Sequence, residues 1–163
     1  MNKSELAPLV DSLIPGFYNF AYSLIPDELQ SEQLVVDAYS VFLVRERDFL
    51  EESEYDASKR PKFKKYIQNQ MIIDILDLGA KRSAHLKSLI RGEREFKSFY
   101  QLELNQRAAL SLKEHLKLGV QDLQEIFGFK KYQIVELLHN ARAALTDASS
   151  RAGQTPGGLE ELR

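Results

Sequence analysis

The residues best suited to bind a charged partner lie in the last third of the chain, at the start of a predicted helix. Four of them are consecutive: Lys130, Lys131, Tyr132 and Gln133. Lysine ammonium groups bind phosphate, and a glutamine amide can read adenine through two hydrogen bonds. Glu136, one turn later, can accept a hydrogen bond from cytosine, although its charge repels phosphate. This cluster predicts contact with duplex DNA.

Apolar residues around these side chains have the spacing of a helix-turn-helix, two short helices that pack nearly at right angles. They are Leu123, Phe127, Phe129, Ile134 and Leu137. Gly128 lies between the two helices, where the turn often needs a positive φ that glycine adopts at little cost. Gln124 fits less well, because a small residue usually stands there. We therefore predict a helix-turn-helix over residues 120–139, with an ordinary helical hairpin as the alternative.

Opposite charges are sorted along the chain. Residues 1–58 hold three Lys or Arg and 12 Asp or Glu, whereas residues 59–97 hold 11 Lys or Arg and four Asp or Glu. Such sorting suggests two different electrostatic partners, and a basic block suits a phosphate backbone because binding releases counterions. The alternative is solvated helix faces that happen to be sorted.

Composition argues against several other classes of protein. The chain has no cysteine, which excludes disulfides and thiolate metal sites. Its three histidines are His85, His115 and His139, and they are too scattered for a metal site or a catalytic group. We expect no enzyme activity, no metal and no cofactor. No run of 18 apolar residues and no signal-peptide pattern occurs, so we expect no membrane association and a cytoplasmic protein.

Helical periodicity is widespread and strand signals are nearly absent, so the predicted fold class is all-α. We expect an apolar helix that ends at Pro15-Gly16, a second helix over 17–25, and a third that begins near Ser31. The polar segment 46–61 is predicted as a loop or frayed helix end. Helix should resume near Pro61, with Gly79 as its cap.

These elements predict two small helical domains joined by a linker. The first covers residues 1–79, the linker 80–98, and the second, with the helix-turn-helix, 99–146. We expect helices over 105–117, 120–127 and 131–146. The remaining segment, 147–163, is rich in Ser, Gly and Pro and is predicted to be a disordered tail.

The chain resembles the bacterial sigma factors of the extracytoplasmic-function group over roughly residues 5–145. The segment from Leu104 to Leu112 (LNQRAALSL) is similar to the opening of that family's promoter −35-binding domain, and His139-Asn140-Ala141-Arg142 to its closing helix. The segment from Ser31 to Tyr39 (SEQLVVDAY) resembles the family's polymerase-binding helix. Phe63-Lys64-Lys65-Tyr66-Ile67, followed by Asp74, is similar to its −10-element helix.

The resemblance implies the partners core RNA polymerase and promoter DNA, and in this family an anti-sigma factor commonly holds the two domains together. The implied polymerase-binding residues are Gln33, Val36, Asp37 and Ser40. The implied DNA-binding residues, taken with the cluster above, are Lys62, Lys65, Lys81, Arg82, Lys130, Lys131, Tyr132, Gln133, Glu136 and Arg142.

Departures from the family fall at exposed functional positions and leave the apolar scaffold intact. In the polymerase-binding helix, Gln33 replaces the usual aspartate and Val36 the usual glutamine. Asp77 replaces an arginine in the −10 helix. In the recognition helix, Val135 with Leu137 and Leu138 looks like a protein-binding face.

Three functions follow from these observations. The first is a divergent sigma factor. The second is a sigma-like module, or decoy, that binds an anti-sigma factor or another transcription regulator without strong promoter binding. The third is a helix-turn-helix repressor.

Overall fold

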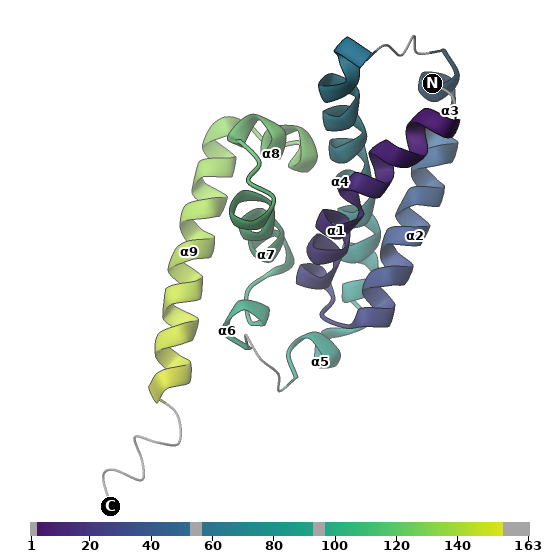
Figure 1. Ribbon diagram of the computed structural model, residues 1–163. Coiled ribbons are helices and arrows are strands. Elements are labelled where there is room, and N and C mark those ends of the chain that lie inside the picture. The colour runs from purple at the N-terminus through teal and green to yellow at the C-terminus, as the bar shows by residue number, and fades with distance from the viewer. Residues whose placement is uncertain (1–2, 53–56, 93–96, 155–163) are drawn as a thin grey trace, which may run out of the picture.

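A computed structural model describes residues 3–52, 57–92 and 97–154 of the 163-residue chain. Within these ranges every regular element is a helix and no strand occurs, so the predicted all-α fold class is confirmed. Figure 1 shows the helices in two groups, with α1, α2 and α4 on one side and α7, α8 and α9 on the other. We call these groups the N-terminal and C-terminal halves.

The N-terminal half is built on three long helices that pack against one another. They are α1 (Lys3–Leu24), α2 (Glu28–Arg45) and α4 (Arg60–Ser83). The side chain of Asp27 begins α2 by accepting a hydrogen bond from the backbone N–H of Gln30 at 2.8 Å. Fully buried side chains from all three helices, among them Phe17, Phe42 and Ile72, form the core between them.

The predicted break at Pro15-Gly16 is wrong, because α1 continues through it to Leu24. A proline in a helix removes one backbone hydrogen bond, which normally disfavours the helix there. Here Leu9 before the proline and Phe17 after it are both buried in the same core. Burial of both segments outweighs the lost bond, and the helix stays continuous.

The prediction that Gly79 caps a helix is also wrong, because Gly79 lies inside α4 and is buried. A Cβ atom at this position would lie 2.8 Å from Cδ1 of Leu24 and 3.4 Å from Cδ2 of Leu34. Glycine is therefore required for close approach of α4 to α1 and α2, not for a turn.

The segments predicted as a loop and a linker contain short helices. The first holds α3 (Arg47–Glu52) and the 3₁₀ turn η1 (Ala57–Lys59), and the second holds α5 (Lys87–Ile90) and the start of α6 (Lys97–Tyr100). Residues 53–56 and 93–96 lie outside the described residues. The division into domains at 80–98 stays a prediction.

The C-terminal half contains α7 (Leu104–Leu110), the π-helical turn η2 (Ser111–His115), α8 (Val120–Phe127) and α9 (Lys131–Gln154). The predicted end of the last helix near residue 146 is wrong. Residues 147–154, which we predicted to be part of the disordered tail, continue the helix. Residues 155–163 lie outside the described part of the chain. Ala144 and Leu145, just before residues 147–154, pack against the small cluster of Leu102, Leu110 and Ala141.

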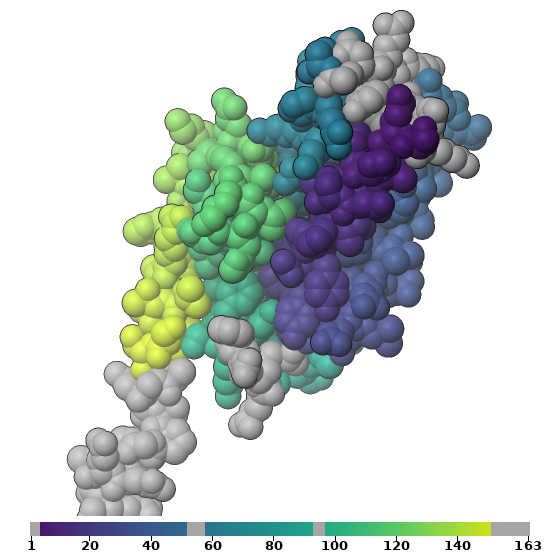
Figure 2. Space-filling view, in the orientation of Figure 1, coloured from purple at the N-terminus to yellow at the C-terminus, as the bar shows by residue number. Residues whose placement is uncertain are grey.

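The two halves share one apolar core. It runs from Leu6 in α1 to Leu138 in α9 without a break. Helix α7 packs on α1, and α8 packs on α4. Figure 2 shows the C-terminal half, in green and yellow, directly against α1 and α4. No helix in the described ranges combines the length and the apolar character needed to cross a membrane.

Candidate functional site

The predicted helix-turn-helix has the expected geometry. Helix α8 ends at Phe127, and Gly128 caps it with a φ of +68°, in the left-handed region that glycine adopts readily. Leu123 and Ile134, one from each helix, are completely buried and hold the two helices together. The turn therefore fixes how the start of α9 is presented to solvent.

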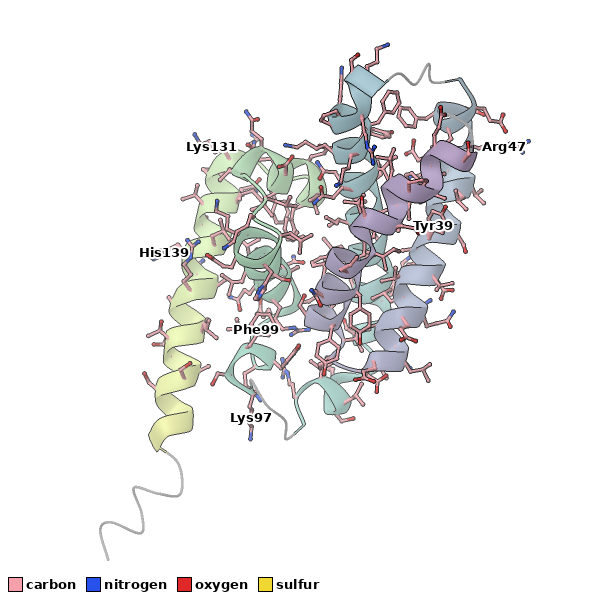
Figure 3. All side chains as sticks on the ribbon, viewed as in Figure 1. Tyr39, Arg47, Lys97, Phe99, Lys131 and His139 are labelled. Carbon is pink, nitrogen blue, oxygen red and sulfur yellow. The ribbon has the colours of Figure 1, made fainter. Side chains whose placement is uncertain are left out.

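The DNA-binding cluster predicted on this second helix faces outward. Lys130, Lys131, Tyr132, Val135, Glu136 and His139 line an open hollow of about 850 Å³. Figure 3 shows Lys131 and His139 pointing away from the body of the molecule. Tyr132 is 64% exposed. The hollow combines two ammonium groups with an aromatic ring, a set that suits a phosphate backbone and an adjacent base.

Two of the predicted DNA-binding side chains already have partners within the chain. Oε1 of Gln133 accepts a hydrogen bond from the backbone N–H of Lys130 at 2.8 Å, which caps the start of α9. Arg142 donates to the carboxylate of Glu114 at 3.0 Å. Oε1 has a second lone pair, so a bidentate contact of Gln133 with adenine would share this oxygen with the capping bond.

An apolar protein-binding face on α9 was predicted from Val135, Leu137 and Leu138, and the prediction is wrong for the two leucines. Leu138 is only 4% exposed, and Leu137 packs against the core. Val135, at 51% exposed, is left on the outer surface. Helical periodicity explains the difference, because neighbouring residues of a helix face in different directions.

On α4, two of the four predicted DNA-binding residues form ion pairs with other helices. Lys62 and Lys81 are exposed. Lys65 forms an ion pair with Asp122 of α8, with 3.1 Å between Nζ and Oδ1. Arg82 forms an ion pair with Asp37 of α2. The structure thus uses half of this set to join helices.

Beside Lys65, two amides of α4 also contact α8. Nδ2 of Asn69 donates to Asp122 at 3.2 Å and to Glu125 at 3.1 Å. Nε2 of Gln70 lies 3.4 Å from Glu125 and donates to it. We call Lys65, Asn69 and Gln70 the donor face of α4. Sequence reasoning missed the two amides, because their role depends on a helix 50 residues away along the chain.

The predicted polymerase-binding residues share the outer side of α2. Gln33, Val36 and Ser40 are exposed, with Val36 at 58%. Asp37, between them, accepts hydrogen bonds from Arg82 and from Gln33, the latter at 2.9 Å. The Arg82 bond and then the Gln33 bond hold the pKa of the Asp37 carboxyl below its ordinary value. Asp37 is therefore ionised at neutral pH.

The apolar part of this surface extends further than predicted. Leu29 and Val44, on the same helix, are 71% and 79% exposed. With Gln33, Val36 and Ser40 they follow a spacing of three to four residues, which places them along one stripe of the helix. We call these five residues the α2 stripe. The three-to-four-residue spacing was visible in the sequence, but which stripe of α2 is buried depends on α1 and α4.

A polar network at the C-terminal end of α2 joins this helix to α4. The guanidinium of Arg45 pairs with the buried carboxylate of Asp74 and donates to Gln70 at 3.2 Å. The hydroxyl of Tyr66 donates to Glu46 at 2.8 Å. Burial, with the Glu46 bond second, raises the pKa of Tyr66 to about 12. Burial also raises the pKa of Asp74, against the opposing effect of Arg45. This network fixes the orientation of the two helices.

The histidines show no metal geometry. His85, His115 and His139 are all exposed. Among the described residues, no group of three or more potential ligands (His, Cys, Asp or Glu) is positioned to hold a metal ion.

Comparison with known proteins supports the fold. No protein-family model matches the sequence, and no curated protein matches it. Among solved structures, the chain is similar to the sigma factor RpoE from Bartonella quintana, determined in complex with the anti-sigma factor NepR. The TM-score is 0.57 at 18% sequence identity, over 91% of this chain and 96% of that one. The chain therefore has a sigma-factor-like fold across both halves.

Proposed function

We propose that this chain is a divergent sigma factor, which binds core RNA polymerase through α2 and promoter DNA through α4 and α9. The observation that carries the proposal is the α2 stripe. Three of its residues, Gln33, Val36 and Ser40, are among the four that the family resemblance assigns to polymerase binding; the fourth is Asp37. Exposed apolar side chains along one helix, between polar ones, are typical of a surface that binds another protein.

The DNA-binding part of the proposal rests on the exposed lysines. Lys130 and Lys131 stand at the open hollow of α9, and Lys62 and Lys81 are exposed on α4. Each phosphate contact adds affinity through counterion release. In this function the N-terminal half would bind polymerase and the −10 element, and the C-terminal half the −35 element. This assignment follows the predicted domains.

A second candidate is a sigma-like module that binds an anti-sigma factor or another regulator without strong promoter binding. Two observations favour it. Lys65, Arg82 and Arg142 are already paired with carboxylates of this chain. In addition, a hollow of about 720 Å³ lies between the halves, with Tyr22 of α1 and Leu145 of α9 among its lining residues. A segment of a regulator seated there would contact both halves at once.

A pull-down from the native host separates the two candidates. The tagged chain should capture the large subunits of core RNA polymerase, and Val36→Glu should lower that yield. Capture of a small regulator with no polymerase subunits would reject the sigma-factor function in favour of the second candidate. A tagged Val135→Glu variant provides the control, because Val135 is similarly exposed but lies on α9.

A further inference from the structure

The hollow of about 720 Å³ between the two halves is lined by four elements. Figure 1 shows α6 between α9 and the end of α1, and these three helices line the hollow together with the π-helical turn η2. The hydroxyl of Tyr100 in α6 donates a hydrogen bond to the backbone carbonyl of Tyr22 in α1 at 3.1 Å, which joins two of these elements. The volume lies in the range of roughly 300–1,000 Å³ that is typical of small-molecule sites.

Ser111, in η2, is the most deeply buried residue that lines the hollow. It is 1% exposed, and its buried Oγ atom has no hydrogen-bonding partner within residues 3–52, 57–92 and 97–154. Ser23 of α1 also lines the hollow and is buried, but its hydroxyl donates to the carbonyl of Phe20 at 2.6 Å. A buried hydroxyl left unpaired costs free energy, so a ligand that pairs with Ser111 would remove this cost.

The backbone at Ser111 has a rare geometry. Ser111–His115 form a π-helical turn, in which the backbone N–H of Leu116 donates to the carbonyl of Ser111 at 3.3 Å. Single turns of this kind are rare in proteins and occur frequently at functional sites. Both ends of η2, Ser111 and His115, line the hollow, so the irregular turn and the unpaired hydroxyl occur at the same place.

The lining of the hollow is largely aromatic and carries no acid or base. The rings of Phe99 and Tyr100 meet edge to face, with 5.0 Å between their centroids, and Tyr22 and Leu145 extend the apolar lining. Among the residues that the structure describes, no Lys, Arg, Asp or Glu lines the hollow. A charged ligand would lose its hydration there without gaining an opposite charge, whereas a neutral aromatic molecule would bury apolar surface against these rings.

We propose that this hollow binds a neutral aromatic small molecule with one hydrogen-bonding group, and that the hydroxyl of Ser111 pairs with that group. A change of rotamer turns Oγ of Ser111 toward the ligand, where it can donate or accept a hydrogen bond. A molecule bound there contacts both halves and therefore stabilises the folded chain. This inference goes beyond the proposed function, because it requires neither polymerase nor DNA.

The test uses three probes that share one aromatic body: naphthol, naphthalene and the anion naphthoate. Titrations followed by protein NMR report where each probe binds. Naphthol should shift the amide signals of Ser111, His115 and Leu145, and should bind roughly tenfold more tightly than naphthoate, because the hollow offers no charge to replace the hydration of a carboxylate. Equal binding of naphthoate, or no shift of these signals with either neutral probe, would overturn the proposal.

Ser111→Ala tests the hydrogen bond to the ligand. The affinity for naphthol should fall roughly tenfold, to that of naphthalene, while the affinity for naphthalene stays unchanged. The control is Ser23→Ala, which removes a hydroxyl that is already paired and should leave the affinity for naphthol unchanged. Without ligand, the melting temperature of Ser111→Ala should equal or exceed that of the wild type, because alanine favours a helix and the unpaired hydroxyl is gone. A lower melting temperature would contradict the proposal, since the hydroxyl would then have a partner in the chain.

Ser149→Trp tests the location of the site. Ser149 is an exposed residue of α9 that lines the hollow, so an indole ring there should fill it and abolish naphthol binding. The matched control is Ser150→Trp, at the next and equally exposed position, which does not line the hollow and should bind naphthol like the wild type. Both variants should fold, because both serines are exposed. Equal naphthol binding by the two variants would place the ligand elsewhere and overturn the proposal.

Discussion

The guanidinium of Arg107 in α7 donates a hydrogen bond to the backbone carbonyl of Leu24, the last residue of α1, at 3.0 Å. It also donates to the carbonyl of Ser23 at 3.0 Å and to that of Leu102. Arg107 is 4% exposed, and its burial lowers its pKa to about 10, so it stays charged at neutral pH. A single side chain of the C-terminal half thus satisfies the carbonyls that end a helix of the other half.

Arg107→Met should destabilise the chain strongly. The change leaves two carbonyls of α1 and one of Leu102 without this donor in a buried place, which should lower the free energy of unfolding by about 3 kcal/mol. Urea denaturation followed by circular dichroism measures the loss. The control is Arg142→Met, which removes an exposed ion pair and should cost less than about 0.5 kcal/mol. Equal effects of both changes would show that Arg107 does not join the halves.

Replacement by alanine should change the stability of the chain in opposite directions at two glycines that lie inside helices. Gly79→Ala places a methyl group 2.8 Å from the fully buried Leu24, and this overpacking should outweigh the better helix propensity, for a net loss of about 1 kcal/mol. Gly16→Ala meets only Leu116 at 3.7 Å, an ordinary contact, and should stabilise α1 by roughly 0.5–1 kcal/mol. Thermal unfolding of the two variants tests the pair. A stabilised Gly79→Ala protein would contradict the close approach of α4 to α1.

The Asp74 carboxyl should give the chain a specific pH dependence. Its pKa in the folded chain is raised above the ordinary value of 3.8 by burial, so the folded state holds this proton more tightly than the unfolded state. The wild-type protein should therefore gain stability relative to Asp74→Asn as the pH falls from 7 toward 4, and lose it as the pH rises again. Denaturation curves across this range measure the difference. The control is Asp147→Asn, an exposed change on α9, which should show no such trend. If the free energy of unfolding of the wild-type protein falls relative to that of Asp74→Asn on acidification, the direction assigned to the pKa of Asp74 is contradicted.

Reversing the charges at the hollow of α9 should weaken duplex binding. In Lys130→Glu/Lys131→Glu, the affinity for duplex DNA should fall, and the slope of log affinity against log salt should flatten by about two units, one for each lost phosphate contact. Fluorescence anisotropy at several salt concentrations provides both values. The matched control, Lys97→Glu/Lys113→Glu, reverses two lysines away from the hollow. If the control weakens binding equally, α9 has no special role in DNA binding.

Sequence patterns predicted the parts of this molecule that depend on local interactions. The helix-turn-helix is one, because Gly128 and the apolar residues around it interact within 20 positions of the chain. Gly79 shows the opposite case, since its role depends on Leu24, which is distant in sequence. The contacts of Asn69 and Arg107 were missed for the same reason. Leu137 and Leu138 were predicted to lie on a protein-binding surface. Both instead face the core, because α9 packs on the other helices of the C-terminal half.

The affinity of the purified chain for core RNA polymerase of its own host tests whether α2 binds polymerase. We expect saturable binding that Val36→Glu weakens by about tenfold, because the change buries a charge in the centre of the α2 stripe. Val135→Glu, the same change on α9, should leave the affinity unchanged. No saturable binding by the wild-type chain, or equal loss in both variants, would contradict a polymerase-binding role for α2.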